Sequence, residues 1–175
     1  MMGVMKSIIL LSGPVGAGKT TVARELIACS AGPIAFIEGD KFWFFIVKSA
    51  YKSRHKDFRT IMTSMTAAAL PYAVAGYEVI IDFSIPPWFL DTVRKIAKVR
   101  DVPVDFVVLR PAEKVCASRA AARAEGAIAD YGPYRDLYSD FDEAAPYTIC
   151  DDEGEAAVVA ARIRKELDKG VFRIS

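Results

Sequence analysis

The sequence predicts an α/β fold, a doubly wound parallel sheet of five strands, and three observations support this prediction. Short apolar runs, typical of strands buried on both faces, alternate with segments of helical periodicity. A glycine-rich segment joins the first such run to the first such helix. Several runs end on a carboxylate or an arginine, as strands do at the ligand-binding edge of such a sheet. With no repeat or linker, we expect one domain spanning residues 1–175.

The predicted strands are short and lie at 6–12, 34–38, 77–82, 104–109 and 147–150. Helices are expected between them because apolar residues recur there every three or four positions. The first spans 20–29, and the second has Ile61, Met65, Ala68 and Tyr72 on one face, with Gly76 as its stop. A third starts at Pro86-Pro87, and a fourth covers about 112–124. A last helix follows a capping box formed by Asp152 and Glu155.

Residues 13–20 read G-x-x-x-x-G-K-T, the pattern of a phosphate-binding P-loop. Glycines let consecutive N–H groups line a concavity at the N-terminus of a helix, where the dipole favours anions. Lys19 adds a charge for the β- and γ-phosphates, and the Thr20 hydroxyl can hold a magnesium ion. The pattern predicts binding of ATP and Mg²⁺. The residues expected to bind the nucleotide are Gly13, Pro14, Val15, Gly16, Ala17, Gly18, Lys19, Thr20 and Thr21.

Three carboxylates at strand ends are candidate site residues, each with a plainer interpretation. Asp40 could orient an acceptor hydroxyl and take its proton, or it could cap a helix starting near Lys41. Asp82 ends a Val-Ile-Ile-Asp strand like a Walker B carboxylate beside magnesium, or it could start a turn. Glu38 could hold a magnesium-bound water or could simply be solvated.

Arg119 and Arg123 are four residues apart on the predicted fourth helix and therefore share a face. An anion between them would remove their mutual repulsion, so we expect them in a lid over the nucleotide, at about 119–146. The alternative is a solvated face. An acceptor-binding insert is predicted at about 41–75. It carries the basic residues Arg54 and Arg59 and, with Trp88 further along, aromatic residues that could line a pocket but are more typical of a core.

Composition limits the classes of partner. The charges nearly balance, with 23 Lys plus Arg against 22 Asp plus Glu, which gives no argument for a nucleic-acid or membrane partner. Cys29, Cys116 and Cys150 are far apart and set among apolar residues, so we expect buried thiols in a reducing cytoplasm rather than disulfides. We expect a monomer or a homodimer with a small-molecule partner.

The motifs together resemble the small P-loop kinases, which include shikimate kinase, gluconate kinase and chloramphenicol phosphotransferase. The resemblance rests on the 13–20 loop, Glu38-Gly39-Asp40-Lys41, the 79–82 strand, and Leu109-Arg110-Pro111 with the two arginines that follow. It implies that Asp40 is the acceptor-binding acid and base, that Arg119 packs near adenine, and that Arg123 is the lid arginine near the phosphates. Glu38 stands where several members have a magnesium-linked Asp. Asp82-Phe83-Ser84 replaces the glycine pair of shikimate kinase and is closer to the zeta-toxin-like branch.

These observations predict a phosphotransferase that moves the γ-phosphoryl group of ATP to a hydroxyl of a small molecule with the help of Mg²⁺. Its catalytic residues would be Lys19, Asp40 and Arg123, and the residues that hold the magnesium ion would be Thr20, Asp82 and Glu38. One alternative is a nucleoside monophosphate kinase, which would use Arg54 and Arg59 as a phosphate clamp. A second alternative is a nucleotide-binding switch without catalysis. We expect Asp151–Glu153 to help distinguish ATP from GTP, while the acceptor is not identified by the motifs.

Overall fold

A computed structural model describes residues 5–124, 126–150 and 154–175. All strand pairs within its central sheet are parallel, and the strand order is β2-β3-β1-β4-β5. This confirms the predicted doubly wound sheet of five strands. The strands are β1 (Ile8–Ser12), β2 (Ile34–Glu38), β3 (Glu78–Asp82), β4 (Val104–Leu109) and β5 (Thr148–Ile149).

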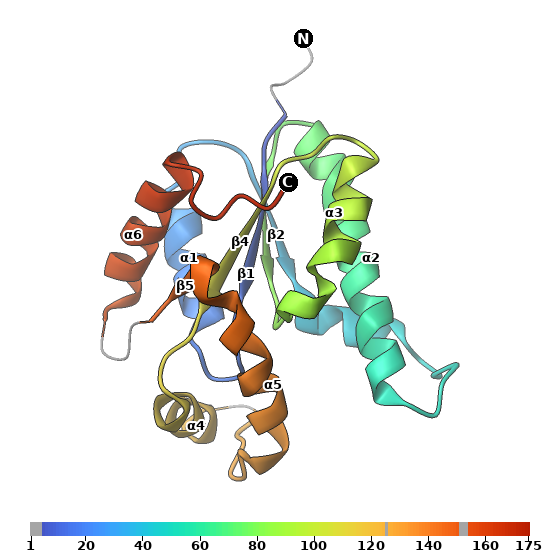
Figure 1. Cartoon of the computed structure of the whole chain (residues 1–175), viewed down its shortest axis with the longest axis vertical. Coiled ribbons are helices and arrows are strands. Elements are labelled where there is room, and N and C mark those ends of the chain that lie inside the picture. The colour runs from blue at the N-terminus through green and yellow to red at the C-terminus, as the bar shows by residue number, and fades with distance from the viewer. Residues whose placement is uncertain (1–4, 125, 151–153) are drawn as a thin grey trace.

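Helices cover both faces of the sheet (Figure 1). On one side lie α1 (Lys19–Ala28) and α6 (Ala156–Asp168), and on the other lie α2 (Arg54–Val74) and α3 (Leu90–Lys98). Beyond the carboxyl ends of the strands lie α4 (Glu113–Ala121) and α5 (Arg135–Ser139). Short 3₁₀ segments complete the fold: η1 (Gly39–Phe45), η2 (Pro87–Phe89), η3 (Gly132–Tyr134) and η4 (Asp140–Tyr147). Among the described helices, none combines the length and apolarity needed to cross a lipid bilayer.

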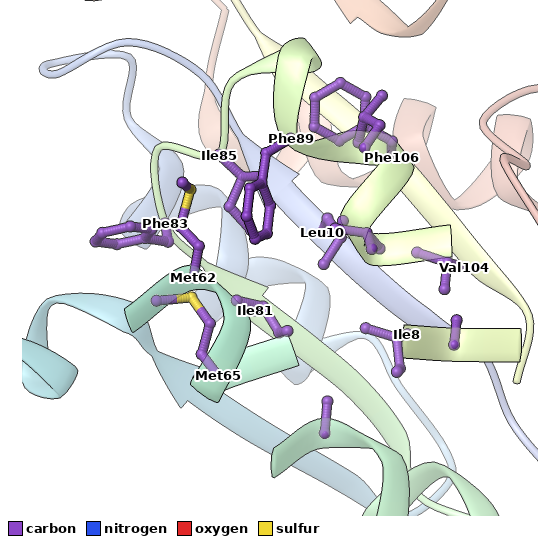
Figure 2. Packing of buried hydrophobic residues seen from close by; sticks show 14 of the residues in the cluster. Ile8, Leu10, Met62, Met65, Ile81, Phe83, Ile85, Phe89, Val104 and Phe106 are labelled. Carbon is purple, nitrogen blue, oxygen red and sulfur yellow. The ribbon is translucent and has the colours of Figure 1, made fainter. Parts of the chain in front are cut away.

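The central strand β1 is buried along its whole length and divides the core in two. Ile8 and Leu10 face α2 and α3, whereas Ile9 and Leu11 face α1 and α6, as the period of two in a strand requires. Figure 2 shows the first of these layers, to which α2 contributes Met62 and Met65. Because strands flank β1 on both sides, the loop that follows it starts at the middle of the sheet edge.

The buried face of α2 differs from the prediction. Ile61 and Met65 are buried as expected, but Tyr72 is 49% exposed and contacts the ring of Tyr77 at the edge of the molecule. The buried face of α2 instead continues through Ala69 and Ala73, which follow Met65 at the four-residue spacing of a helix face. The helix ends at Val74, before Gly76 with its positive φ of 93°.

The ends of two other helices also correct the sequence prediction. The helix α4 stops at Ala121 instead of about 124, because the chain turns back and the Ile128 amide donates to the Ala120 carbonyl at 3.0 Å. The predicted capping box of α6 is not formed as expected. Glu155 itself occupies the N-cap position and the helix starts at Ala156, while Asp152 lies outside the described residues.

The cysteines are free, as expected, but only Cys116 is buried. Cys29 and Cys150 are exposed, so the prediction of three buried thiols was wrong for two of them. Both lie just after short secondary-structure elements, Cys29 at the C-cap of α1 and Cys150 after the two-residue strand β5. The apolar neighbours in the sequence are therefore poor evidence of burial at these positions.

Candidate active site

The loop between β1 and α1 has a backbone that only glycine can adopt at three positions. Gly13, Gly16 and Gly18 have φ values of 137°, 82° and 90°. A Cβ on Gly13 would lie 2.1 Å from the Leu109 carbonyl oxygen, and one on Gly16 would lie 2.1 Å from that of Cys116. The loop is therefore packed against the end of β4 and against α4 while its amides stay at the N-terminus of α1.

Lys19 places its ammonium group inside this loop. Its Nζ donates to the carbonyl oxygens of Gly13 at 3.1 Å and Pro14 at 3.0 Å, and to the Ser84 hydroxyl at 3.0 Å. Desolvation lowers the pKa of Lys19, and the carboxylates of Asp82 and Asp40 act in the opposite direction. A cation surrounded by backbone dipoles at a helix N-terminus suits a polyphosphate ligand.

Thr20 and Asp82 are brought together across the sheet edge. The Thr20 hydroxyl donates to Oδ2 of Asp82 at 2.6 Å, and Asp82 is 9% exposed. Burial raises the pKa of Asp82, while the neighbouring Lys19 ammonium partly offsets this shift.

This oxygen pair fits the type of site that magnesium uses beside phosphates, with one carboxylate and one hydroxyl from the protein. No cluster of three or more acidic, histidine or cysteine side chains exists among the described residues that could hold a metal by itself. Thr20 and Asp82 would therefore hold Mg²⁺ only together with oxygens from a nucleotide.

A cleft of about 410 Å³, the phosphate cleft, opens above the loop, and most of the residues predicted to bind the nucleotide line it. Gly13 and Pro14 lie behind it, where they shape the loop and accept from Lys19. An adjoining pocket of about 250 Å³ has a mostly apolar lining that includes Ala17, Leu109 and Arg119 and suits a flat base. Asp151–Glu153 lies outside the described residues. The predicted residues in the first cleft are Val15, Gly16, Gly18, Lys19, Thr20, Thr21, Asp40, Asp82, Arg119 and Arg123.

Asp40 lies in the 3₁₀ segment η1 and lines the phosphate cleft, where its carboxylate acts on the pKa of Lys19. The backbone reaches this place because Gly39 passes over the ring of Phe83, so closely that a Cβ would lie 2.6 Å from it. Glu38 behaves differently. Its carboxylate pairs with Lys41 at 2.9 Å and does not line the cleft among the described residues, although its charge still raises the pKa of Asp82.

The two arginines both reach the phosphate cleft, but they do not share a helix face as predicted. Arg119 is in the last turn of α4, whereas Arg123 follows the end of the helix. The guanidinium of Arg123 contributes to the lowered pKa of Lys19, so its charge acts at the phosphate position. Within the described part of the chain, Arg123 forms no ion pair with a carboxylate.

A second, larger cleft of about 860 Å³ continues from the first. It lies between the predicted insert, represented by Trp43, Arg54 and Phe58, and the predicted lid, represented by Tyr134 and Leu137. Among the residues that the structure describes, five line both clefts and therefore mark the boundary between them: Val15, Asp40, Phe83, Ser84 and Arg123.

Three further residues position the site and were not predicted from the sequence. Ser84 accepts from Lys19, and Ser12 fixes the segment around Ser84 because its hydroxyl donates to the Ile85 carbonyl at 2.7 Å and accepts from the Ile85 amide at 2.8 Å. The Tyr131 hydroxyl donates to the Val15 carbonyl at 2.7 Å and holds the segment around Tyr131 against the loop. Ser84 could have been predicted, because it lies two residues after the strand-end carboxylate Asp82. The contact of Tyr131 could not, because it joins residues 116 positions apart and no local pattern indicates it.

Comparison with known proteins gives the same fold. The tunicamycin resistance protein of Deinococcus radiodurans has a TM-score of 0.69 at 20% identity, covering 93% of this chain and 95% of that one. The Mycobacterium tuberculosis APS kinase, solved with AMPPNP and APS, has a TM-score of 0.68 at 16% identity, with 94% and 98% covered. Shikimate kinase from Bacteroides thetaiotaomicron has a TM-score of 0.64 at 19% identity, with 93% and 98% covered.

Sequence comparison adds the family. A search of curated proteins gives no significant match. The model of an AAA domain family matches residues 8–131, which include the glycine-rich loop, β1 to β4, Arg119 and Arg123. The chain therefore belongs to this AAA domain family and has the fold of the small P-loop kinases.

Proposed function

We propose that the protein is an ATP- and Mg²⁺-dependent kinase that phosphorylates a hydroxyl group of a small molecule. The observation that carries the proposal is the boundary between the two clefts. Asp40 and Arg123 line both the phosphate cleft and the larger cleft, so a carboxylate and a guanidinium lie where an acceptor would meet the terminal phosphate. The neighbours in fold include proteins described as shikimate kinase, APS kinase and a sugar kinase, which supports a small acceptor.

Each residue then has a defined task. ATP supplies the phosphoryl group, and Mg²⁺ neutralises charge on its phosphates. Lys19 and the amides of the loop bind the phosphates, with Thr20 and Asp82 on the side of the metal. Asp40 orients the acceptor hydroxyl and accepts its proton, while Arg123 stabilises charge on the group in transfer.

The nucleoside monophosphate kinase alternative requires Arg54 and Arg59 to converge on a phosphate. Arg54 lines the larger cleft, with its guanidinium 4.6 Å from the ring of Trp43. Arg59 instead lies over Trp88, at 5.1 Å, and is not among the described residues that line the cleft. Of this pair, Arg54 lines the cleft and Arg59 does not, and because a phosphate clamp needs both cations, this favours a hydroxyl acceptor over a phosphate.

The test is ADP release from ATP and Mg²⁺ in the presence of alcohols, sugars and nucleoside monophosphates, with ATP binding measured separately by calorimetry. Asp40→Asn should lower turnover about 10²- to 10⁴-fold, the usual contribution of a general base, and should leave ATP affinity nearly unchanged. Asp91→Asn, at an exposed carboxylate paired with Arg94, is the matched control and should retain full turnover.

Undiminished turnover in Asp40→Asn, combined with loss in Arg54→Ala, would replace the proposal with the monophosphate kinase. Tight ATP binding with no phosphorylated product from any acceptor would support the nucleotide-binding switch instead. Lys19→Ala should abolish both ATP binding and turnover, and it separates true turnover from a contaminating ATPase.

A further inference from the structure

The larger cleft has aromatic walls built from separate parts of the chain. Its aromatic lining residues come from η1, α2, the segment after β3, η2 and η3. At about 860 Å³, the cleft lies within the range of about 300–1,000 Å³ that is typical of sites for drug-sized ligands. The aromatic residues are Trp43, Phe58, Phe83, Trp88 and Tyr134.

Phe58 connects these walls into one surface. Its ring centroid lies 6.4 Å from that of Trp43 with the planes nearly parallel, 5.5 Å from that of Phe83, and 6.4 Å from that of Trp88 in an edge arrangement. Phe83 also lines the phosphate cleft, so the aromatic surface extends up to the position of Asp40. The end of the cleft at Asp40 is thus polar and reactive, and the rest of the lining combines these rings with the polar residues Arg54, His55, Asp136 and Asp140.

Phe83 belongs to the core, but Trp43, Phe58 and Trp88 are not buried within it. Trp88 is 37% exposed, and its indole N–H donates to Asp140, another residue of the cleft wall, at 3.2 Å. Trp43 and Phe58 are half-buried and pack against the core from outside. Large aromatic rings kept partly open around a cleft are typical of a surface that contacts a ligand ring.

We propose that the acceptor carries an aromatic ring, which packs against Phe58, Trp43 and Trp88 while its hydroxyl lies at Asp40. This inference rests on the proposed kinase function and adds the chemical class of its substrate. Aromatic contacts beyond simple area burial correspond to about a 2- to 12-fold gain in affinity, so an aromatic ligand should be preferred over its saturated counterpart by that factor.

The chain offers a direct binding signal that does not depend on catalysis. It contains two tryptophans, Trp43 and Trp88, and both line this cleft. We would titrate the protein, without ATP, with phenylpropanol against cyclohexylpropanol and with biphenylmethanol against bicyclohexylmethanol, and follow tryptophan fluorescence. The expected result is saturable binding of the aromatic member of each pair, about 2- to 12-fold tighter than that of the saturated member.

Phe58→Leu keeps apolar volume and both fluorophores, and it should abolish this preference. Phe44→Leu is the matched control, because Phe44 lies in η1 but is 81% exposed and outside the lining of the cleft, and the preference should remain. If Phe58→Leu fails to fold, the preference of the wild-type protein still tests the proposal. Equal binding of both members, or no saturable signal with the aromatic probes, would overturn it.

The same compounds are then assayed for ADP release, which separates the two proposals. Selective binding of aromatic compounds without any phosphorylated product, from these or larger hydroxylated aromatics, would sink the kinase proposal and leave an aromatic-binding cleft. Phosphorylation of non-aromatic alcohols, with no preference for rings in binding or turnover, would keep the kinase and reject the aromatic acceptor.

Discussion

Gly16 offers a sharp test of how the phosphate-binding loop is packed. Its φ of 82° is in the left-handed region, and an added Cβ would lie 2.1 Å from the carbonyl oxygen of Cys116 in α4. The obstructing atom belongs to the backbone, so no side-chain rotation can relieve the contact. Gly16→Ala must therefore shift either the loop or α4.

The expected loss has two parts. An alanine in the left-handed conformation costs about 1–2 kcal/mol, and forcing an extra methyl group into a packed region costs about 1–3 kcal/mol more. Gly16→Ala should thus lower the free energy of unfolding by about 2–5 kcal/mol. For a chain of this size each kcal/mol changes Tm by about 2–4 °C, so the expected fall is about 4–20 °C.

Two other glycines separate these contributions in urea unfolding followed by circular dichroism. Gly170 has a φ of 70° with open space around its Cβ position, so Gly170→Ala should lose only the conformational part, about 1–2 kcal/mol. Gly32 has neither a positive φ nor a neighbour within 4 Å, and Gly32→Ala should be neutral or stabilising by up to about 1 kcal/mol. Equal losses for Gly16→Ala and Gly170→Ala would refute the close packing of the loop on α4.

Three further predictions concern the site. Burial raises the pKa of Asp82 above its ordinary 3.8, so the ionised carboxylate opposes folding. In thermal melts, Asp82→Asn should therefore be at least as stable as the wild type at neutral pH, and the difference in stability should vanish below about pH 3.8. ATP at about 100 times its Kd should stabilise the wild type by about 2.7 kcal/mol, and EDTA should reduce this stabilisation in the wild type but not in Asp82→Asn. Tyr131→Phe should lose about 0.5–1.5 kcal/mol in urea unfolding, because the partly buried Val15 carbonyl loses its donor.

The outcomes that would contradict these predictions are equally specific. A lower neutral-pH stability of Asp82→Asn would mean that the Thr20 and Lys19 contacts outweigh the desolvation of the carboxylate. If EDTA does not change the stabilisation of the wild type by ATP, Asp82 does not help to hold magnesium. Unchanged stability in Tyr131→Phe would mean that water satisfies the Val15 carbonyl in the variant.

Features with a local cause could be predicted from the sequence. The strands follow from apolar runs, and the G-x-x-x-x-G-K-T pattern located the loop that the structure places above β1. The placement of Asp40 and Asp82 in one cleft could be predicted because parallel strands end at one edge of the sheet. In each case a pattern of a few residues, together with the rule for the sheet, is sufficient.

Features that depend on distant segments could not be predicted. The end of α4 is fixed by the hydrogen bond from Ile128 back to Ala120, and the segment around Tyr131 is held by its hydrogen bond to Val15. The exposure of Tyr72 depends on which side of α2 meets the sheet. The assignments of one domain, of the insert at 41–75 and of the lid at 119–146 remain predictions, although both segments contribute walls to the larger cleft.

The way the two clefts meet has a consequence for how such a protein can be redesigned. Among the described residues, five line both clefts, and most of the outer walls come from η1, α2 and the 133–140 segment, away from the glycine-rich loop. Effects of substitutions in separated sites generally add without interaction. Residues such as Trp43 and Leu137 could therefore be exchanged to fit another ligand while the residues of the glycine-rich loop stay unchanged.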